Sequence, residues 1–104
     1  MNVHRQGDVL LVRVKSIPEG AIEQPAPDGR LVLAFGEVTG HAHAFYDDAY
    51  NVKLYTHGGA RYLDIMAPAE LKHEEHSTAK IPAGKWLLPQ QVEYTPKELI
   101  RVAD

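Results

Sequence analysis

Cysteine is absent from all 104 residues of the chain. Its absence excludes a disulfide framework, a thiolate zinc site and a cysteine nucleophile, and it fits a reducing compartment. The first residues contain no apolar signal core, and no apolar run approaches the roughly 20 residues of a membrane helix. We therefore expect a cytoplasmic protein with no membrane contact.

Basic patches are also missing. The 11 lysines and arginines are scattered among 14 acidic residues, which gives a net charge of −3 with histidine neutral. No basic stripe indicates a nucleic-acid partner. The two serines, Ser16 and Ser77, lie outside a Gly-x-Ser-x-Gly elbow, and the sequence has neither a phosphate loop nor a dinucleotide fingerprint.

Short β-forming runs separated by turn residues dominate what is present. The length suits a single domain over 1–104 with one hydrophobic core. Seven or eight such runs predict an all-β fold, either a small antiparallel β-barrel or a sandwich. The segments expected are a strand over 7–15 that is buried on both faces or lies at the start of a barrel, a surface loop over 16–29, and an alternating strand over 30–38.

The second half of the chain predicts further strands. Residues 69–81 read as one strand with an irregular middle, and Pro82-Ala83-Gly84 is a turn. A strand then begins at Lys85, where the following Pro89 indicates a sheet edge or a bulge. Gly36 and Gly40, within strand-like sequence, suggest further bulges or bends.

A β-hairpin around Gly58-Gly59 is the most strongly determined element. The two glycines predict a two-residue primed turn. Counting outward pairs Leu54 with Leu63, Val52 with Ile65, Tyr55 with Tyr62 and Lys53 with Asp64. Each complementary pair contributes about 0.2–1 kcal/mol. A register slipped by one residue would lose all four pairs, so we expect this register.

The C-terminal residues leave two alternatives open. Thr95-Pro96-Lys97-Glu98 is a capping box with proline at the first helical position, which predicts a short helix. Residues 99–102 could instead form a last strand that pairs with the first. A segment this short is decided by tertiary contacts.

Histidine is the residue type that points to chemistry. Four of the six histidines form two clusters, His41 with His43 and His73 with His76. On a strand, residues i and i+2 point to the same face with Cα atoms about 7 Å apart, so the first two imidazoles can converge on one ion. A chance pair on a solvated face is the alternative.

The second cluster has a different spacing. His73 and His76 are three residues apart, which places them on opposite faces of a regular strand and on one side only at a helical turn or bulge. The spacing does not match the His-Glu-x-x-His motif of zinc proteases. The intervening Glu74 and Glu75 suit a solvated surface.

Together the clusters predict a divalent-metal site formed by His41, His43, His73 and His76. Imidazole ligands without cysteine allow zinc, copper, nickel or iron(II). Glu37 and Glu75 are the candidates for a carboxylate partner or catalytic group. An open coordination position would activate water for hydrolysis or engage O₂.

A non-catalytic role is the alternative function. The same histidines would then form a hydrogen-bonded structural cluster in a module that binds a partner protein or a small molecule. Such a module could also form a homo-oligomer that covers its edge strands. His4 and His57 read as exposed histidines without a role. The sequence leaves open whether the protein is an enzyme.

Several segments resemble a family of small bacterial and phage proteins without an assigned activity. The matching segments are His4-Arg5-Gln6-Gly7-Asp8-Val9-Leu10-Leu11, Gly36-Glu37-Val38-Thr39-Gly40-His41-Ala42-His43, His73-Glu74-Glu75-His76, Pro82-Ala83-Gly84 and Glu93-Tyr94-Thr95-Pro96. The resemblance covers nearly the whole chain and implies membership of an uncharacterised family.

Two more distant resemblances concern the fold. His41-Ala42-His43 and Pro82-Ala83-Gly84 are similar to fragments of the two cupin motifs, and cupins are small β-barrels that hold a metal on a His-x-His strand. The segments 7–12 and 98–102 are similar to the paired end strands of the small co-chaperonin barrel. These resemblances imply a barrel, and the cupin one implies metal ligation by His41 and His43.

Overall fold

The computed structural model describes residues 2–26, 30–35, 41–46 and 51–89. Ten β-strands form within these ranges, which contain no helix and so none that could cross a membrane. The strands are β1 (Val3–Gln6), β2 (Val9–Val14), β3 (Ile22–Gln24), β4 (Arg30–Phe35), β5 (Ala42–Tyr46), β6 (Val52–His57), β7 (Ala60–Ile65), β8 (Ala69–Lys72), β9 (Ala79–Ile81) and β10 (Gly84–Leu88).

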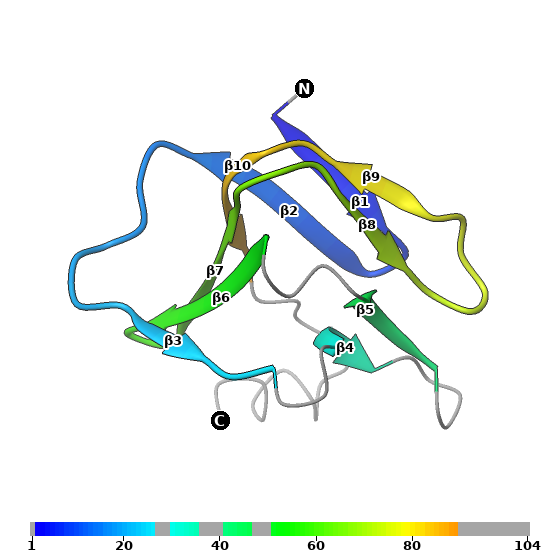
Figure 1. The fold of residues 1–104 in the computed structure, drawn as a ribbon, viewed down its shortest axis with the longest axis horizontal. Coiled ribbons are helices and arrows are strands. Elements are labelled where there is room, and N and C mark those ends of the chain that lie inside the picture. The colour runs from blue at the N-terminus through cyan, green and yellow to red at the C-terminus, as the bar shows by residue number, and fades with distance from the viewer. Residues whose placement is uncertain (1, 27–29, 36–40, 47–50, 90–104) are drawn as a thin grey trace, which may run out of the picture.

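The strands build two antiparallel sheets. One has the order β1-β2-β10-β7-β6-β3, and the other has the order β4-β5-β8-β9. The all-β prediction is confirmed, and of its two alternatives the described strands form a sandwich rather than a closed barrel. The edge strands β1 and β9 lie next to each other where the two sheets meet (Figure 1).

Alternating apolar side chains from both sheets fill the core. The fully buried large side chains are Trp86, Phe45, Leu11, Leu63, Ile65, Leu71 and Ile81. Burying an aliphatic or phenylalanine side chain of this size stabilises the fold by about 1.5–3 kcal/mol. Two polar residues, Gln6 and His43, are also buried, with 3% and 4% of their surface exposed. Buried polar groups need hydrogen-bond partners, and these two side chains contact each other.

The hairpin of β6 and β7 has the expected register in all four predicted pairs. Gly58 and Gly59 have φ angles of 56° and 84°, the positive values that a primed turn requires. Lys53 and Asp64 lie opposite each other in this register, but their charged side chains contact other residues. Lys53 lies 3.5 Å from Glu23, whereas Asp64 lies 3.8 Å from Lys85.

The N-terminal third contains more structure than expected. The predicted single strand over 7–15 is wrong at its start, because a turn at Gly7-Asp8 joins two paired strands, β1 and β2. On β2, one face buries Val9 and Leu11, but Leu10, Val12 and Val14 on the other face are only partly buried, so burial on both faces is also wrong. The predicted loop over 16–29 contains β3, which pairs with β6.

The segment over 69–81 is two strands rather than one. β8 and β9 pair with each other, and residues 73–78 connect them. The prediction of an edge or bulge at Pro89 is wrong for β10, which lies between β2 and β7 and ends at Leu88. The predicted bulges at Gly36 and Gly40 and the C-terminal helix or strand lie outside the described residues.

Candidate metal centre

His43 lies on β5, in the interior of its sheet. β5 pairs with β4 on one side and with β8 on the other, and four of its five residues are buried. Its antiparallel register with β8 places Ala44 opposite Lys72. Continuing that register by one residue beyond the end of β8 brings His73 opposite His43, and their ring centroids are 4.3 Å apart.

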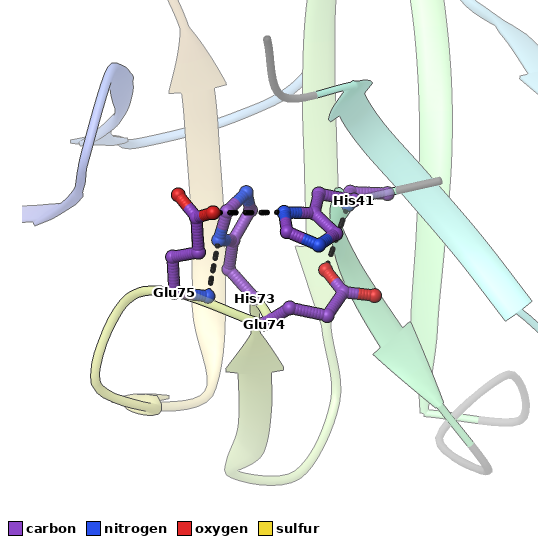
Figure 2. Close-up of polar contacts among 5 residues, drawn as sticks. His41, His73, Glu74 and Glu75 are labelled. Atoms are coloured by element: carbon purple, nitrogen blue, oxygen red, sulfur yellow. Dashed lines mark hydrogen bonds and ion pairs between the residues drawn. The ribbon is translucent and has the colours of Figure 1, made fainter. Parts of the chain in front are cut away.

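The same register organises the next residues of the 73–78 connection. The amide of Ala42 donates to Glu74 Oε1 over 3.0 Å, and His41 Nδ1 lies 3.2 Å from Glu75 Oε2. Figure 2 shows Glu74 and Glu75 approaching the backbone and the ring at this end of β5. The connection therefore continues the antiparallel pairing through side chains after the backbone ladder has ended.

Three histidines come close enough to share an ion. His43, His73 and His76 each offer one nitrogen, and these atoms all lie within 4.8 Å of one another. In a tetrahedral zinc site, with Zn–N of about 2.0–2.1 Å, nitrogen atoms are about 3.3 Å apart. Any two of these nitrogen atoms that are farther apart than this would have to approach each other for tetrahedral coordination. His76 is the exposed member of the three and lies on the connection between β8 and β9.

His41 lies beside this group rather than in it. Its ring centroid is 5.8 Å from that of His73, and its side chain faces Glu75 (Figure 2). Of the two carboxylate candidates, Glu75 contacts His41 through its side chain, while its amide donates to His73 Nδ1 over 3.0 Å. Glu37 lies outside the described residues. All four predicted ligands thus reach one region, but only three converge.

The contact between Gln6 and His43 was not predicted from the sequence. Gln6 Oε1 lies 2.9 Å from His43 Nδ1, and its Nε2 donates to the carbonyl oxygens of Leu71 and Ser77 over 2.6 Å and 2.9 Å. One sequence feature could have indicated Gln6. It is a polar residue directly before Gly7, within a segment that resembles the uncharacterised family. Its partners, however, are 37 to 71 residues away in the sequence, beyond local patterns.

Gly7 completes the surroundings of the three histidines. A Cβ atom added at Gly7 would lie 2.6 Å from His76 Nε2, so the β1–β2 turn packs directly against this ring. The turn residue has a φ of 56°, which glycine adopts without strain. The β1–β2 hairpin therefore supplies both Gln6 and the backbone wall beside His76.

Burial keeps His43 in the form that metals bind. Desolvation lowers the pKa of His43 below its ordinary value, and the neighbouring His73 and His76 lower it further, while Asp8 and Glu74 act in the opposite direction. The pKa of Glu74 is also lowered, chiefly by the hydrogen bond from the Ala42 amide. Neutral imidazole beside an ionised carboxylate suits a cation, because only neutral imidazole coordinates.

An open cavity of about 750 Å³ lies elsewhere in the structure. Its lining includes Asp8, Ala34, Leu88 and the guanidinium-bearing Arg61, but none of the three converging histidines. Arg61 donates to the carbonyl oxygen of Leu33 over 2.8 Å, and burial lowers its pKa. The three converging histidines thus lie outside the lining of this cavity, although its Asp8 adjoins Gly7 and acts on the pKa of His43.

The site lies inside a segment that matches a family model over residues 5–91, described as a domain of unknown function, DUF8820. The chain belongs to the DUF8820 family. The expectation of an uncharacterised family is thereby confirmed, and the DUF8820 match includes Gln6 and both histidine clusters. No curated protein and no solved structure matches the chain. The cupin and co-chaperonin resemblances receive no support from these comparisons.

Proposed function

We propose that this DUF8820 domain binds a divalent metal ion through His43, His73 and His76. The observation that carries the proposal is the convergence of three imidazole nitrogens within 4.8 Å. His73 Nε2 adds to it, because this buried atom has no hydrogen-bond partner in the described part of the chain. Buried polar atoms without a partner are uncommon in folded proteins, and an ion would satisfy this one.

The ligand set favours a metal of the zinc class. Three neutral nitrogens suit zinc, copper, nickel or iron(II), and cysteine is absent. Three protein ligands leave a fourth position for water or a substrate atom. In this proposal His41 and Glu75, which contact each other beside the three ligands, would be available to exchange protons with a bound molecule. Hydrolysis and O₂ chemistry are the two reaction classes that such a position supports.

A non-catalytic module with a structural histidine cluster is the second candidate. It is favoured by the hydrogen bond from the Glu75 amide to His73 Nδ1. A neutral His73 that accepts there carries its proton on Nε2. An ion at Nδ1 would replace this hydrogen bond, and an ion at Nε2 would require the proton to move to Nδ1, which also breaks the hydrogen bond. In this alternative the stacked rings, with His43 and His76 at 5.6 Å and 18°, pack against one another without an ion.

Metal titration separates the two candidates. Tag-free protein, stripped with chelator, is titrated calorimetrically with Zn²⁺ and followed by visible absorption with Co²⁺. We expect one ion per chain, and a loss of affinity above about 100-fold in His43→Ala, His73→Ala and His76→Ala, since even losing a partner of a ligand costs 10–100-fold.

His57→Ala is the matched control, because His57 is an exposed histidine at the end of β6. It should bind as the wild type does. A wild-type chain without stoichiometric binding, or alanine variants that keep their affinity, would favour the structural cluster. His41→Ala should retain binding, because His41 lies outside the converging group.

A further inference from the structure

We propose that Gln6 is the positioning residue of this centre and that it fixes His43 in the tautomer whose Nε2 is free to coordinate. The inference rests on the proposed metal site. In this inference Gln6 is not a metal ligand and acts through its contact with His43. Gln6 is also the second buried polar residue of the described core, beside His43 itself.

The orientation of the Gln6 amide follows from two of its partners. Nε2 lies 2.6 Å from the carbonyl oxygen of Leu71 and 2.9 Å from that of Ser77. Carbonyl oxygens only accept hydrogen bonds, so both amide hydrogens are used there. The flipped amide would place its oxygen against two other oxygens. The remaining atom, Oε1, therefore faces His43.

The tautomer of His43 follows in turn. Oε1 only accepts, so its 2.9 Å contact with His43 Nδ1 requires the proton on Nδ1. A neutral ring protonated at Nδ1 keeps its lone pair on Nε2. The other nitrogen is thereby left as the donor to a metal, which is the arrangement that partners of metal-bound histidines commonly enforce.

Gln6 also acts on the other two histidines through the backbone. It lies on β1 in the six-stranded sheet, whereas Leu71 belongs to β8 in the other sheet. Leu71 precedes His73 by two residues, and Ser77 follows His76 directly. One amide group thus holds both ends of the segment that carries two ligands while its oxygen orients the third.

Imidazole ¹⁵N NMR of the metal-free wild type tests the tautomer directly. We expect a protonated Nδ1 and an unprotonated Nε2 on His43. In Gln6→Leu this preference should be lost, and Zn²⁺ affinity should fall 10- to 100-fold. Gln24→Leu is the matched control, because Gln24 donates to Thr56 and to the backbone on β3, remote from the histidines. It should change neither measurement.

Gln6→Glu separates orientation from anchoring. The carboxylate keeps an acceptor for His43 but loses both donors to Leu71 and Ser77, so we expect the wild-type tautomer with a lower melting temperature. This variant also provides the measurement if Gln6→Leu does not fold. A proton on Nε2 of His43 in the wild type, or an unchanged tautomer and affinity in Gln6→Leu, would overturn the role of Gln6. A wild type that binds no Zn²⁺ overturns the proposed function instead, so the two failures are distinguishable.

Discussion

Gly7 meets two requirements at one position. Its φ of 56° lies in the left-handed region, and its missing side chain leaves room for the ring of His76. Gly58 has the same φ of 56°, but a Cβ added there meets nothing within 4 Å. Comparing the same substitution at Gly7 and at Gly58 therefore separates the cost of backbone strain from the cost of a steric clash with His76.

Gly58→Ala should cost about 1–2 kcal/mol of unfolding free energy, the cost of the left-handed conformation for an L-residue. Gly7→Ala should cost more and should also weaken Zn²⁺ binding, because the new Cβ at 2.6 Å displaces the His76 ring. Urea unfolding and calorimetric titration measure the two effects. Equal stability losses and equal affinities for the two variants would contradict the packing of Gly7 against His76.

His4 is half-buried rather than exposed, contrary to expectation. Its ring meets Trp86 edge to face at 5.2 Å, and the Arg13 guanidinium lies 4.4 Å from the Trp86 ring. Burial lowers the pKa of His4, and nearby positive charge, including Arg13, lowers it further. The side chain is therefore neutral in the folded protein at neutral pH and resists protonation.

The lowered pKa of His4 makes the stability of the protein depend on pH. Because the pKa of His4 is below 6.5 in the folded state, the unfolded chain binds more protons than the folded protein in mildly acidic solution. The contribution of neutral His4 to stability is therefore complete above about pH 6.5 and is lost as the pH falls through the lower folded pKa. Denaturant unfolding at several pH values, with chelator present, should show a steeper acid decline for wild type than for His4→Phe. Parallel declines would exclude this contribution.

At the scale of elements, the pairing of β5 with β8 creates the site. Leu71 is fully buried on β8 opposite Phe45, and its carbonyl accepts from Gln6 two residues before His73. Leu63 on β7 is equally buried, but it lies in the hairpin of the other sheet. The two leucines allow a comparison between general destabilisation and local loosening of the site.

Leu71→Ala and Leu63→Ala should each lower the free energy of unfolding by about 2–5 kcal/mol, because each leaves a core cavity. Only Leu71→Ala should also weaken Zn²⁺ binding, since it loosens the strand that leads into His73. The measurements are urea unfolding and titration at a temperature where both variants are folded. Equal Zn²⁺ affinities would show that β8 does not position the ligands.

At the scale of the molecule, polar side chains join the two sheets at separate places. Gln6 on β1 reaches β8, and Arg61 on β7 donates to the Leu33 carbonyl on β4. The candidate ion would add a link within the four-stranded sheet, because its ligands come from β5 and from the β8–β9 connection. An ion bound only by the folded state stabilises that state by mass action.

Zn²⁺ at 100 times its dissociation constant should therefore raise the free energy of unfolding by about 2.7 kcal/mol. Thermal melts with Zn²⁺, with chelator and with Zn²⁺ followed by excess chelator measure the gain and its reversal. His57→Ala should show the full gain, and His43→Ala should show none. A gain that survives in His43→Ala would place the ion elsewhere.

The local features could be predicted from the amino-acid sequence alone. The β6–β7 hairpin was predictable because Gly58-Gly59 fixes the turn and four complementary pairs fix the register within 14 residues, from Val52 to Ile65. The histidine clusters were visible for a similar reason, since they are short spacings of metal-ligand residue types. The absence of cysteine restricted that chemistry to imidazole and carboxylate.

Which histidines converge depends on contacts between strands that are distant in the sequence. The register of β5 against β8 places His73 opposite His43 and sets His41 against Glu75, and no local spacing encodes a pairing across 30 residues. Gln6 joins the group from the other sheet, over 37 to 71 residues of sequence. Such contacts form because two hydrophobic sheet faces bury each other, and the polar groups that meet between them are a consequence of that packing.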